Sequence, residues 1–198
     1  MIAIIDYNAG NITSVKNAVD RLGYSSKVTN SHEDIINAEK VIFPGVGHAS
    51  SAMNILTDRG IDTIIKSLIQ PTLGICLGLQ LMCKHSEEGN KMEGVECMGI
   101  FDAVVKRFPV NDIVPHMGWN RITCSDNSHQ LFKGFNEEDS LYFIHSYFAT
   151  VCNQTIAKCD YILPFSAALQ KDNFYATQFH PEKSGDVGEL ILKNFLEI

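Results

Sequence analysis

The chain has 198 residues, a formal net charge of −7 and 45% hydrophobic residues. This length suits a single domain over residues 1–198, which is large enough to bury a substantial core. The acidic balance argues against a nucleic-acid partner, because such a partner would require a basic face. No apolar run is long enough to cross a bilayer, so we expect no membrane contact.

The N-terminus and the cysteines indicate where the protein works. Residues 1–6 are too short for a signal peptide and lack its basic flank, and they suit a buried strand instead. The six cysteines show no Cys-x-x-Cys spacing. Neither a zinc site nor a disulfide framework is therefore supported, and we expect a cytoplasmic protein that holds no metal.

The first half of the sequence alternates predicted strands and helices. Residues 2–7 form a short apolar run, as in a strand that is covered on both faces. A helix follows, which Asn11 can cap and Gly23 ends. Further strands are predicted at residues 27–29, 40–43 and 72–75, and further helices at 31–38, at 51–69 with a break near Gly60, and at 77–84. This order favours an α/β fold with an open, mixed but mostly parallel sheet and helices on both faces.

The second half of the sequence predicts mainly strands. They are expected at residues 103–108, 119–124, 141–145, 155–161, 167–170 and 174–178. Because few helices separate them, we expect antiparallel pairs here and a mixed sheet overall. Residues 187–196 have the pattern of a closing amphipathic helix.

Cys76 lies in a Gly-x-Cys-x-Gly sequence between a predicted strand and a predicted helix. This arrangement resembles a nucleophile elbow, in which glycines allow a sharp turn that exposes the nucleophile at the helix N-terminus. The positive end of a helix favours a thiolate there. A small buried hydrophobe is the alternative interpretation of this segment alone, and it is the preferred one for the other five cysteines.

His180 and Glu182 flank Pro181 at the end of another predicted strand. In an extended segment residues i and i+2 point the same way, so Glu182 can hold one imidazole nitrogen while the other faces a thiol. Alone, this segment would suit a surface loop. Ligand sites of α/β sheets lie at strand ends, however, and both motifs are expected there. Together they predict a cysteine nucleophile, its base and the group that orients the base, which indicates acyl transfer on an amide.

The sequence Gly45-Val46-Gly47 follows the strand before the elbow. Its glycines allow a backbone N–H to turn toward the site, where it would form an oxyanion hole with the N–H of Leu77. A phosphate loop is not indicated, because no Gly-Lys-Ser/Thr follows. Four other side chains can make hydrogen bonds but have no catalytic spacing, and they suit a core or a surface loop: His116, Trp119, His145 and Tyr147.

Over its whole length the sequence resembles the class I glutamine amidotransferases, through residues 74–80 and the His180-Pro181-Glu182 step. Within that family it is similar to the glutaminase subunits of imidazole glycerol phosphate synthases. The segments that carry this closer resemblance are residues 6–12, 44–47, 114–120, 143–147 and 179–184.

The resemblance implies a glutaminase that passes ammonia to a cyclase subunit with a (β/α)₈ barrel, as a heterodimer, in histidine biosynthesis. It needs no metal or organic cofactor. The implied catalytic triad is Cys76, His180 and Glu182. The implied residues that bind glutamine are Gly45, Val46, Gly47, Leu77, Gln80, Glu88, His145, Ser146 and Tyr147. The implied residues of the partner interface are Asn8, Asn11, Trp119 and Lys183.

Three alternatives remain open at this point. The first is the glutaminase subunit of another ammonia-channelling enzyme, such as pyridoxal phosphate synthase, against which residues 116–120 argue. The second is a cysteine hydrolase of glutamyl substrates that has no ammonia acceptor. The third is a catalytically silent binding subunit of the same assembly, against which the complete triad argues.

Overall fold

The computed structural model describes residues 1–8, 11–89, 93–109, 112–126 and 128–198. In this part of the chain eight strands form one sheet in the order β2-β1-β3-β4-β14-β13-β12-β9. Their bounds are β1 Ile2–Ile5, β2 Ser26–Thr29, β3 Lys40–Gly45, β4 Thr72–Cys76, β9 Thr123–Cys124, β12 Thr155–Tyr161, β13 Leu163–Lys171 and β14 Phe174–Thr177. The first five strands in this order pair in parallel, and the last three are antiparallel.

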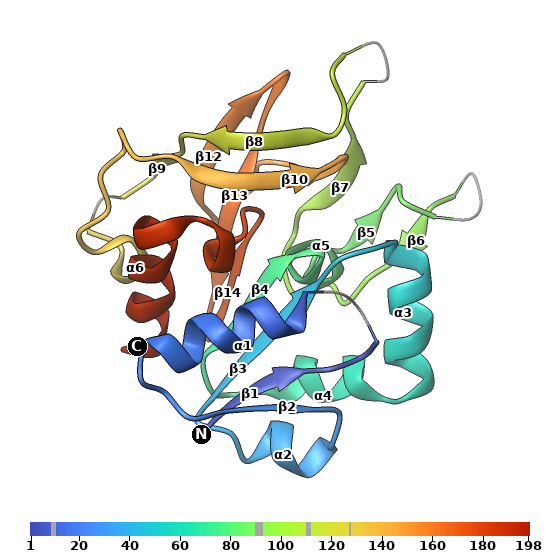
Figure 1. The fold of residues 1–198 in the computed structure, drawn as a ribbon. Helices are drawn as coiled ribbons and strands as arrows, with labels where there is room; N and C mark the ends of the chain where they lie inside the picture. The colour runs from blue at the N-terminus through green and yellow to red at the C-terminus, as the bar shows by residue number, and fades with distance from the viewer. Residues whose placement is uncertain (9–10, 90–92, 110–111, 127) are drawn as a thin grey trace.

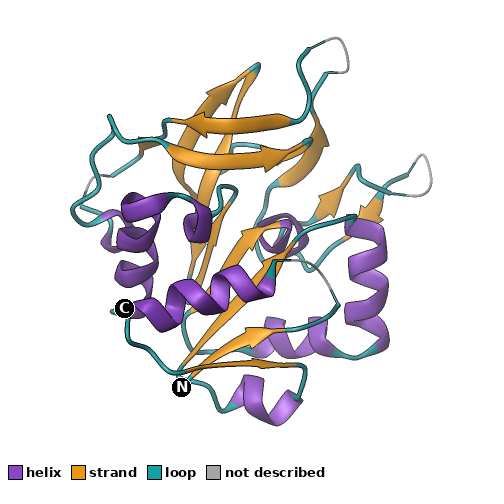
Figure 2. Ribbon diagram, in the orientation of Figure 1, coloured by secondary structure: helices purple, strands orange, loops and turns teal. Residues whose placement is uncertain are grey.

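Helices cover both faces of this sheet (Figures 1 and 2). One face packs against α1 (Ile12–Arg21) and α6 (Gly185–Leu196). The other packs against α2 (His32–Ile36), α3 (Ala49–Asp58), α4 (Ile61–Ser67) and α5 (Leu77–Met82). Successive residues of a strand point to opposite faces, and β1 accordingly divides its apolar side chains between the two hydrophobic cores. The α/β fold predicted from the sequence is confirmed.

Two smaller sheets lie over the end of the central sheet where β4 and β14 finish (Figure 1). One pairs β8 (His116–Asn120) with β10 (Leu141–His145). The other has the order β11-β7-β5-β6, with bounds β5 His85–Ser86, β6 Val95–Glu96, β7 Val104–Arg107 and β11 Tyr147–Ala149. Two short 3₁₀ helices, Gln130–Phe132 and Pro181–Lys183, complete the secondary structure of the described residues.

The structure corrects several expectations. The strand predicted over residues 119–124 is divided, because β8 pairs with β10 whereas β9 pairs with β12. The strand predicted at 167–170 is longer, since β13 pairs with β12 from Leu163 onward. Asn11 precedes α1 but makes no side-chain cap, because its Oδ1 accepts from the Ser14 hydroxyl while its Nδ2 donates to Glu182. The helix break at Gly60 is confirmed, and this residue has a φ of 67° between α3 and α4.

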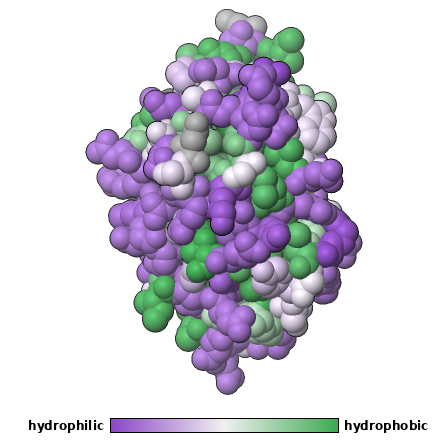
Figure 3. All heavy atoms as spheres, turned by 90° about the vertical axis from the view of Figure 1, so that its left-hand side faces the viewer, coloured by the Kyte–Doolittle hydropathy of each residue, from purple (hydrophilic) through white to green (hydrophobic). Residues whose placement is uncertain are grey.

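The outer surface and the lengths of the helices bear on contact with a membrane. The face next to α6 and β9 is mainly hydrophilic (Figure 3), as expected for the solvent side of surface elements. In the part of the chain that the structure describes, no helix is both long and apolar enough to span a bilayer.

Candidate active site

Cys76 occupies a sharp turn between β4 and α5, as the elbow motif predicts. Its φ of 54° and ψ of −104° are unusual for a residue with a side chain. The turn also brings Gly78 against β3, because a Cβ at Gly78 would lie 2.0 Å from the carbonyl oxygen of Phe43. Only glycine permits this approach. Cys76 is left 6% exposed and lines a cavity.

His180 reaches the same place from the neighbouring strand. β14 pairs in parallel with β4, with Thr177 opposite Ile75, so the residues that follow both strands meet at one edge of the sheet. His180 Nδ1 lies 2.8 Å from Glu182 Oε1, and both side chains are almost fully buried. The predicted contact is therefore present, and His180 itself is extended as predicted, but the extended backbone does not continue beyond it. Residues Pro181–Lys183 form a 3₁₀ turn that brings the carboxylate to the ring.

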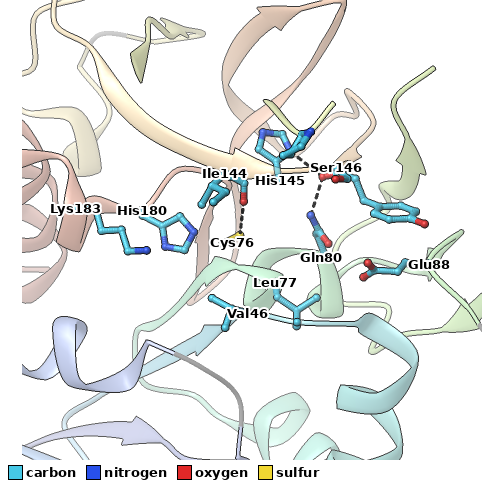
Figure 4. Close-up of a pocket in the computed structure, with 13 residues that line it drawn as sticks. Val46, Cys76, Leu77, Gln80, Glu88, Ile144, His145, Ser146, His180 and Lys183 are labelled. Carbon is cyan, nitrogen blue, oxygen red and sulfur yellow. Dashed lines mark hydrogen bonds between the residues drawn. The ribbon is translucent and has the colours of Figure 1, made fainter. Parts of the chain in front are cut away.

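The surroundings of His180 favour its charged form. Burial opposes the imidazolium, but the thiolate of Cys76 and the carboxylate of Glu182 outweigh burial and raise the pKa of His180 to about 10. Since Glu182 holds Nδ1, the other ring nitrogen, Nε2, is the one that can exchange a proton with a ligand. Nε2 has no hydrogen-bond partner among the described residues. Figure 4 shows His180 beside Cys76.

A cavity of about 380 Å³ opens at this edge of the sheet (Figure 4). Cys76 lies at its centre, with His180 on one side and Gln80 and Glu88 on the other. Burial raises the pKa of Glu88, whose Oε2 accepts the N–H of Ala49 at 2.9 Å. The cavity is lined by Val46, Gly47, Cys76, Leu77, Gln80, Glu88, Pro115, Ile144, His145, Ser146, Tyr147, His180 and Lys183.

These lining residues include every residue predicted to bind glutamine except Gly45. Gly45 lines a smaller pocket behind the turn, together with Asn11 and Glu182. It pairs in register with Cys76, so the turn after β3 does lie next to the elbow, as expected. Among the described residues no group of three His, Cys, Asp or Glu side chains is arranged to hold a metal ion.

A series of hydrogen bonds, which we call the polar chain, runs from β8 to the floor of the cavity. Its members are the side chains of Asn120, His116, His145, Gln80 and Gln178, and the carbonyl oxygen of Tyr147 joins His145 to Gln80. His116 Nδ1 lies 3.0 Å from His145 Nε2, and His145 Nδ1 lies 2.8 Å from the carbonyl oxygen of Tyr147. Because a carbonyl only accepts, His145 carries its proton on Nδ1 and accepts from His116. Both imidazoles are therefore neutral donors within the polar chain.

Burial keeps these two imidazoles neutral. It lowers the pKa of His145 to about 3 and that of His116 to about 4. His116 also stacks on Tyr161 with a ring distance of 3.9 Å. Since both nitrogens of His145 are engaged, its ring has no hydrogen bond to offer a ligand. Any contact of His145 with glutamine must use its backbone.

A family model, Glutamine amidotransferase class-I, matches residues 3–198. The chain belongs to the class I glutamine amidotransferase family. Among its relatives, "Imidazole glycerol phosphate synthase subunit HisH" of Bacteroides fragilis is 58% identical, over 100% of this chain and 99% of the relative. The protein of the same name from Pasteurella multocida is 45% identical, over 99% and 97% of the two chains.

Solved structures share the fold of this amidotransferase at low sequence identity. The structure of PurLQS from Thermotoga maritima has a TM-score of 0.73 and 13% identity, over 99% of this chain and 97% of its own. The glutaminase domain of Trypanosoma brucei CTPS with bound acivicin has a TM-score of 0.68 and 15% identity, over 99% and 93%. The amidotransferase is thus an enzyme with glutaminase activity.

The residues predicted for the partner interface lie at different places around the site. Trp119 is 59% exposed on β8, and Lys183 is exposed where it lines the cavity of the amidotransferase. Asn8 is exposed after β1. Asn11 instead turns inward, and its Nδ2 donates to Glu182 Oε1 at 3.3 Å. The Asn11 amide therefore supports the carboxylate that holds His180.

Sequence reasoning missed two polar side chains of this amidotransferase site. Gln178 Nε2 lies 3.6 Å from the sulfur of Cys76. The hydroxyl of Tyr7 is fully buried against Gly45, where it occupies the space that a Cβ would need. The position of Gln178, directly after a buried strand and two residues before His180, was the one signal available for it.

Proposed function

We propose that this amidotransferase is the glutaminase subunit of an imidazole glycerol phosphate synthase and acts in histidine biosynthesis. It hydrolyses glutamine to glutamate and ammonia through a thioester on Cys76. One observation carries the chemistry: His180 is held through Nδ1 by Glu182 at 2.8 Å, while its unpartnered Nε2 faces the site of Cys76. The relatives that carry this synthase name support the pathway, since they match the full chain at 43–58% identity.

Acylation uses groups that lie around one cavity. The Cys76 thiolate attacks the carboxamide carbon of glutamine, and the N–H groups of Val46 and Leu77 stabilise the oxyanion that forms. The His180 imidazolium donates the Nε2 proton to the leaving ammonia. Glu182 remains ionised and keeps the ring in the tautomer that this transfer requires.

Deacylation reverses the role of His180. The neutral imidazole removes a proton from water, the resulting hydroxide attacks the thioester carbon, and glutamate leaves with regeneration of the thiolate. The opposite end of the cavity would bind the amino-acid end of the substrate. There the Glu88 carboxylate attracts the α-ammonium group, and the 146–147 segment and Gln80 provide further polar contacts.

Ammonia released here must reach an acceptor before it is protonated in water, so the site requires a docked partner. We assign that role to a cyclase with a (β/α)₈ barrel, bound as a heterodimer over the mouth of the cavity. The mouth suits a protein partner because exposed apolar side chains surround it: Val46, Met117, Trp119 and Ile144. Lys183 adds a cation at this rim. We place the reaction in the cytoplasm, where free cysteines such as the six found here persist.

Substitution of the nucleophile tests the chemistry. Cys76→Ala should lower glutaminase turnover of the complex by on the order of 10³-fold or more, since loss of a nucleophile removes the covalent route. A matched variant, Cys124→Ala, changes a thiol on β9 outside the cavity and should keep parental turnover. Undiminished hydrolysis by Cys76→Ala would reject the proposed mechanism.

Charge reversal at the rim tests the partner surface. Lys183→Glu should weaken binding of the cyclase or raise the ratio of glutamate to imidazole product, because the rim would no longer seal against the partner. Lys133→Glu, at an exposed lysine that does not line the cavity, should change neither quantity. If Lys183→Glu leaves both the affinity and the product ratio at parental values, Lys183 is not part of the interface.

A further inference from the structure

We propose that Gln178 is a positioning residue for the nucleophile: its side-chain amide donates a hydrogen bond to the sulfur of Cys76 and holds it as a thiolate in attacking position. This inference rests on the proposed function, because a stabilised thiolate matters only if Cys76 attacks the substrate. Gln178 follows β14 directly, and β14 adjoins the strand that ends in Cys76.

The contact is within hydrogen-bonding distance for sulfur, and it is closed to water. Gln178 Nε2 lies 3.6 Å from Cys76 Sγ, and Gln178 is 0% exposed. A buried amide costs free energy unless its polar atoms have partners. Both ends of this amide do have partners, because Gln178 Oε1 lies 3.1 Å from Gln80 Nε2. The amide is therefore held between the nucleophile and a residue of the cavity wall.

The orientation of the Gln178 amide follows from its neighbours. The carbonyl oxygen of Tyr147 lies 2.8 Å from the terminal atom of Gln80, and because it only accepts, that atom is the nitrogen Nε2. Nε2 gives its second hydrogen to Gln178, whose facing atom must be the oxygen. The amide nitrogen of Gln178 is then the atom that remains for the sulfur. A donor, rather than an acceptor, faces Cys76.

The polar chain prevents this amide from turning over. The same Tyr147 carbonyl accepts the Nδ1 proton of His145, which in turn accepts from His116. Rotation of the Gln178 amide would break its bond to Gln80 and place two NH₂ groups against each other. A donor that is fixed before the reaction needs no reorganisation when charge develops, which is the condition under which such donors contribute most.

The other polar neighbour of the sulfur acts in the opposite direction. The carbonyl oxygen of Ile144 lies 3.9 Å from Cys76 Sγ and can only accept, so it favours the protonated thiol. Among the described residues, Gln178 makes the side-chain hydrogen bond to this sulfur, while His180 is the charged group that faces it. Removal of the Gln178 N–H would leave the thiol form with its backbone partner, whereas the thiolate would keep the charge of His180 but lose its neutral donor.

The test compares Gln178→Met, Gln178→Glu and the parent. The full chain is labelled with iodoacetamide over a range of pH, and modified Cys76 is quantified by mass spectrometry of its peptide. Both variants should raise the midpoint of the labelling curve, Gln178→Met by about one pH unit and Gln178→Glu by more, because the added carboxylate also repels the thiolate. Gln178→Glu keeps the shape of the side chain and an acceptor for Gln80, so it remains informative if Gln178→Met does not fold.

Turnover is then measured on the complex with the cyclase. The kcat for glutamine hydrolysis should fall about ten- to a hundredfold, whereas KM should change little because Gln178 does not line the cavity. Gln170→Met, on the adjacent strand β13, is the matched control and should leave both the labelling curve and kcat unchanged.

The outcomes distinguish a failure of the role proposed for Gln178 from a failure of the proposed glutaminase function. An unchanged midpoint in a folded Gln178→Glu variant would overturn the role of Gln178, even if kcat fell. A raised midpoint with parental kcat would also overturn it, because the bond would then be irrelevant to attack. A parent complex that fails to hydrolyse glutamine would reject the proposed function, while the labelling curve would still test the hydrogen bond itself.

Discussion

The two sides of Cys76 differ in how completely their buried polar atoms are satisfied. On the side of the polar chain, each side-chain amide and imidazole from Asn120 to Gln178 has a hydrogen-bond partner. On the other side lie the three buried side-chain atoms that have no hydrogen-bond partner in the described structure. They are the hydroxyl of Tyr7, Nε2 of His180 and Oε2 of Glu182.

This difference separates binding from chemistry. A satisfied network keeps one geometry, which suits the wall that receives the substrate and the atom that holds the sulfur. In the proposed mechanism Nε2 of His180 exchanges a proton, and a permanent hydrogen-bond partner there would compete with ammonia and water. Buried polar atoms without partners are rare in proteins, and their concentration beside one cysteine therefore indicates function.

The largest effect is expected from the unsatisfied side. Glu182→Gln keeps an oxygen for His180 but removes the charge that stabilises the imidazolium, so kcat should fall by on the order of 10²–10⁴-fold. KM for glutamine and the melting temperature should remain near parental values. Stopped-flow measurement of thioester formation on the complex checks this, with Glu189→Gln on α6 as a surface control. Equal rates for Glu182→Gln and the parent would remove Glu182 from the triad.

Acid should destabilise the folded protein through the polar chain, because His116 and His145 are neutral there. In the folded protein His145 and His116 have pKa values of about 3 and about 4, lowered by burial, whereas an unfolded histidine titrates near its ordinary 6.5. Their stabilising effect is complete above pH 6.5 and is lost as the pH falls toward these folded values. His180, with its raised pKa, acts in the opposite sense and partly offsets the loss. We expect the free energy of unfolding to fall by about 2 kcal/mol between pH 7.5 and pH 5.

Denaturant titrations at both pH values measure this change. His116→Asn should show a shallower dependence on pH than the parent, because one of the two neutral imidazoles is absent. Exposed His32→Asn is the matched control and should retain the parental slope. Identical slopes for His116→Asn and the parent would show that the pair is not the source of acid sensitivity.

The smallest expected effect is on the free energy of unfolding, in one pair of matched Tyr→Phe substitutions. Tyr7→Phe removes a buried hydroxyl without a partner, so the free energy of unfolding should stay the same or rise by up to about 1 kcal/mol. Tyr161→Phe removes a hydroxyl that donates to the carbonyl of Ile113 at 2.6 Å, and should lower it by about 0.5–1 kcal/mol. Destabilisation by Tyr7→Phe equal to that by Tyr161→Phe would contradict the difference between the two sides.

The sequence predicted the features that depend on neighbouring residues. The elbow at Cys76 follows from two glycines and a strand-to-helix change, and the parallel half of the sheet follows from regular alternation. The conformation of residues 181–183 could not be predicted in this way, since Pro181 also suits the first position of a 3₁₀ turn. Strands β5 and β6 have only two residues each, which is too short for any periodic pattern.

The polar chain depends on pairings that no local pattern contains. His116 and His145 meet because β8 and β10 place them directly opposite each other in an antiparallel ladder. Gln178 meets Cys76 because their strands are neighbours in the sheet, although 102 positions separate them in the sequence. The sequence shows hydrogen-bonding side chains at these positions, but no local pattern predicts which of them lie in contact.

The place of β14 in the sheet has a consequence for how the enzyme is made. β14 lies between β4 and β13, and β13 pairs with β12 on its other side. During synthesis the segment with Cys76 emerges long before β13, β14 and His180, which we propose as its base. Contacts this distant along the chain form late in folding. A polypeptide that ends before residue 180 therefore carries Cys76 without its proposed base, and we expect glutamine hydrolysis only from a nearly complete polypeptide.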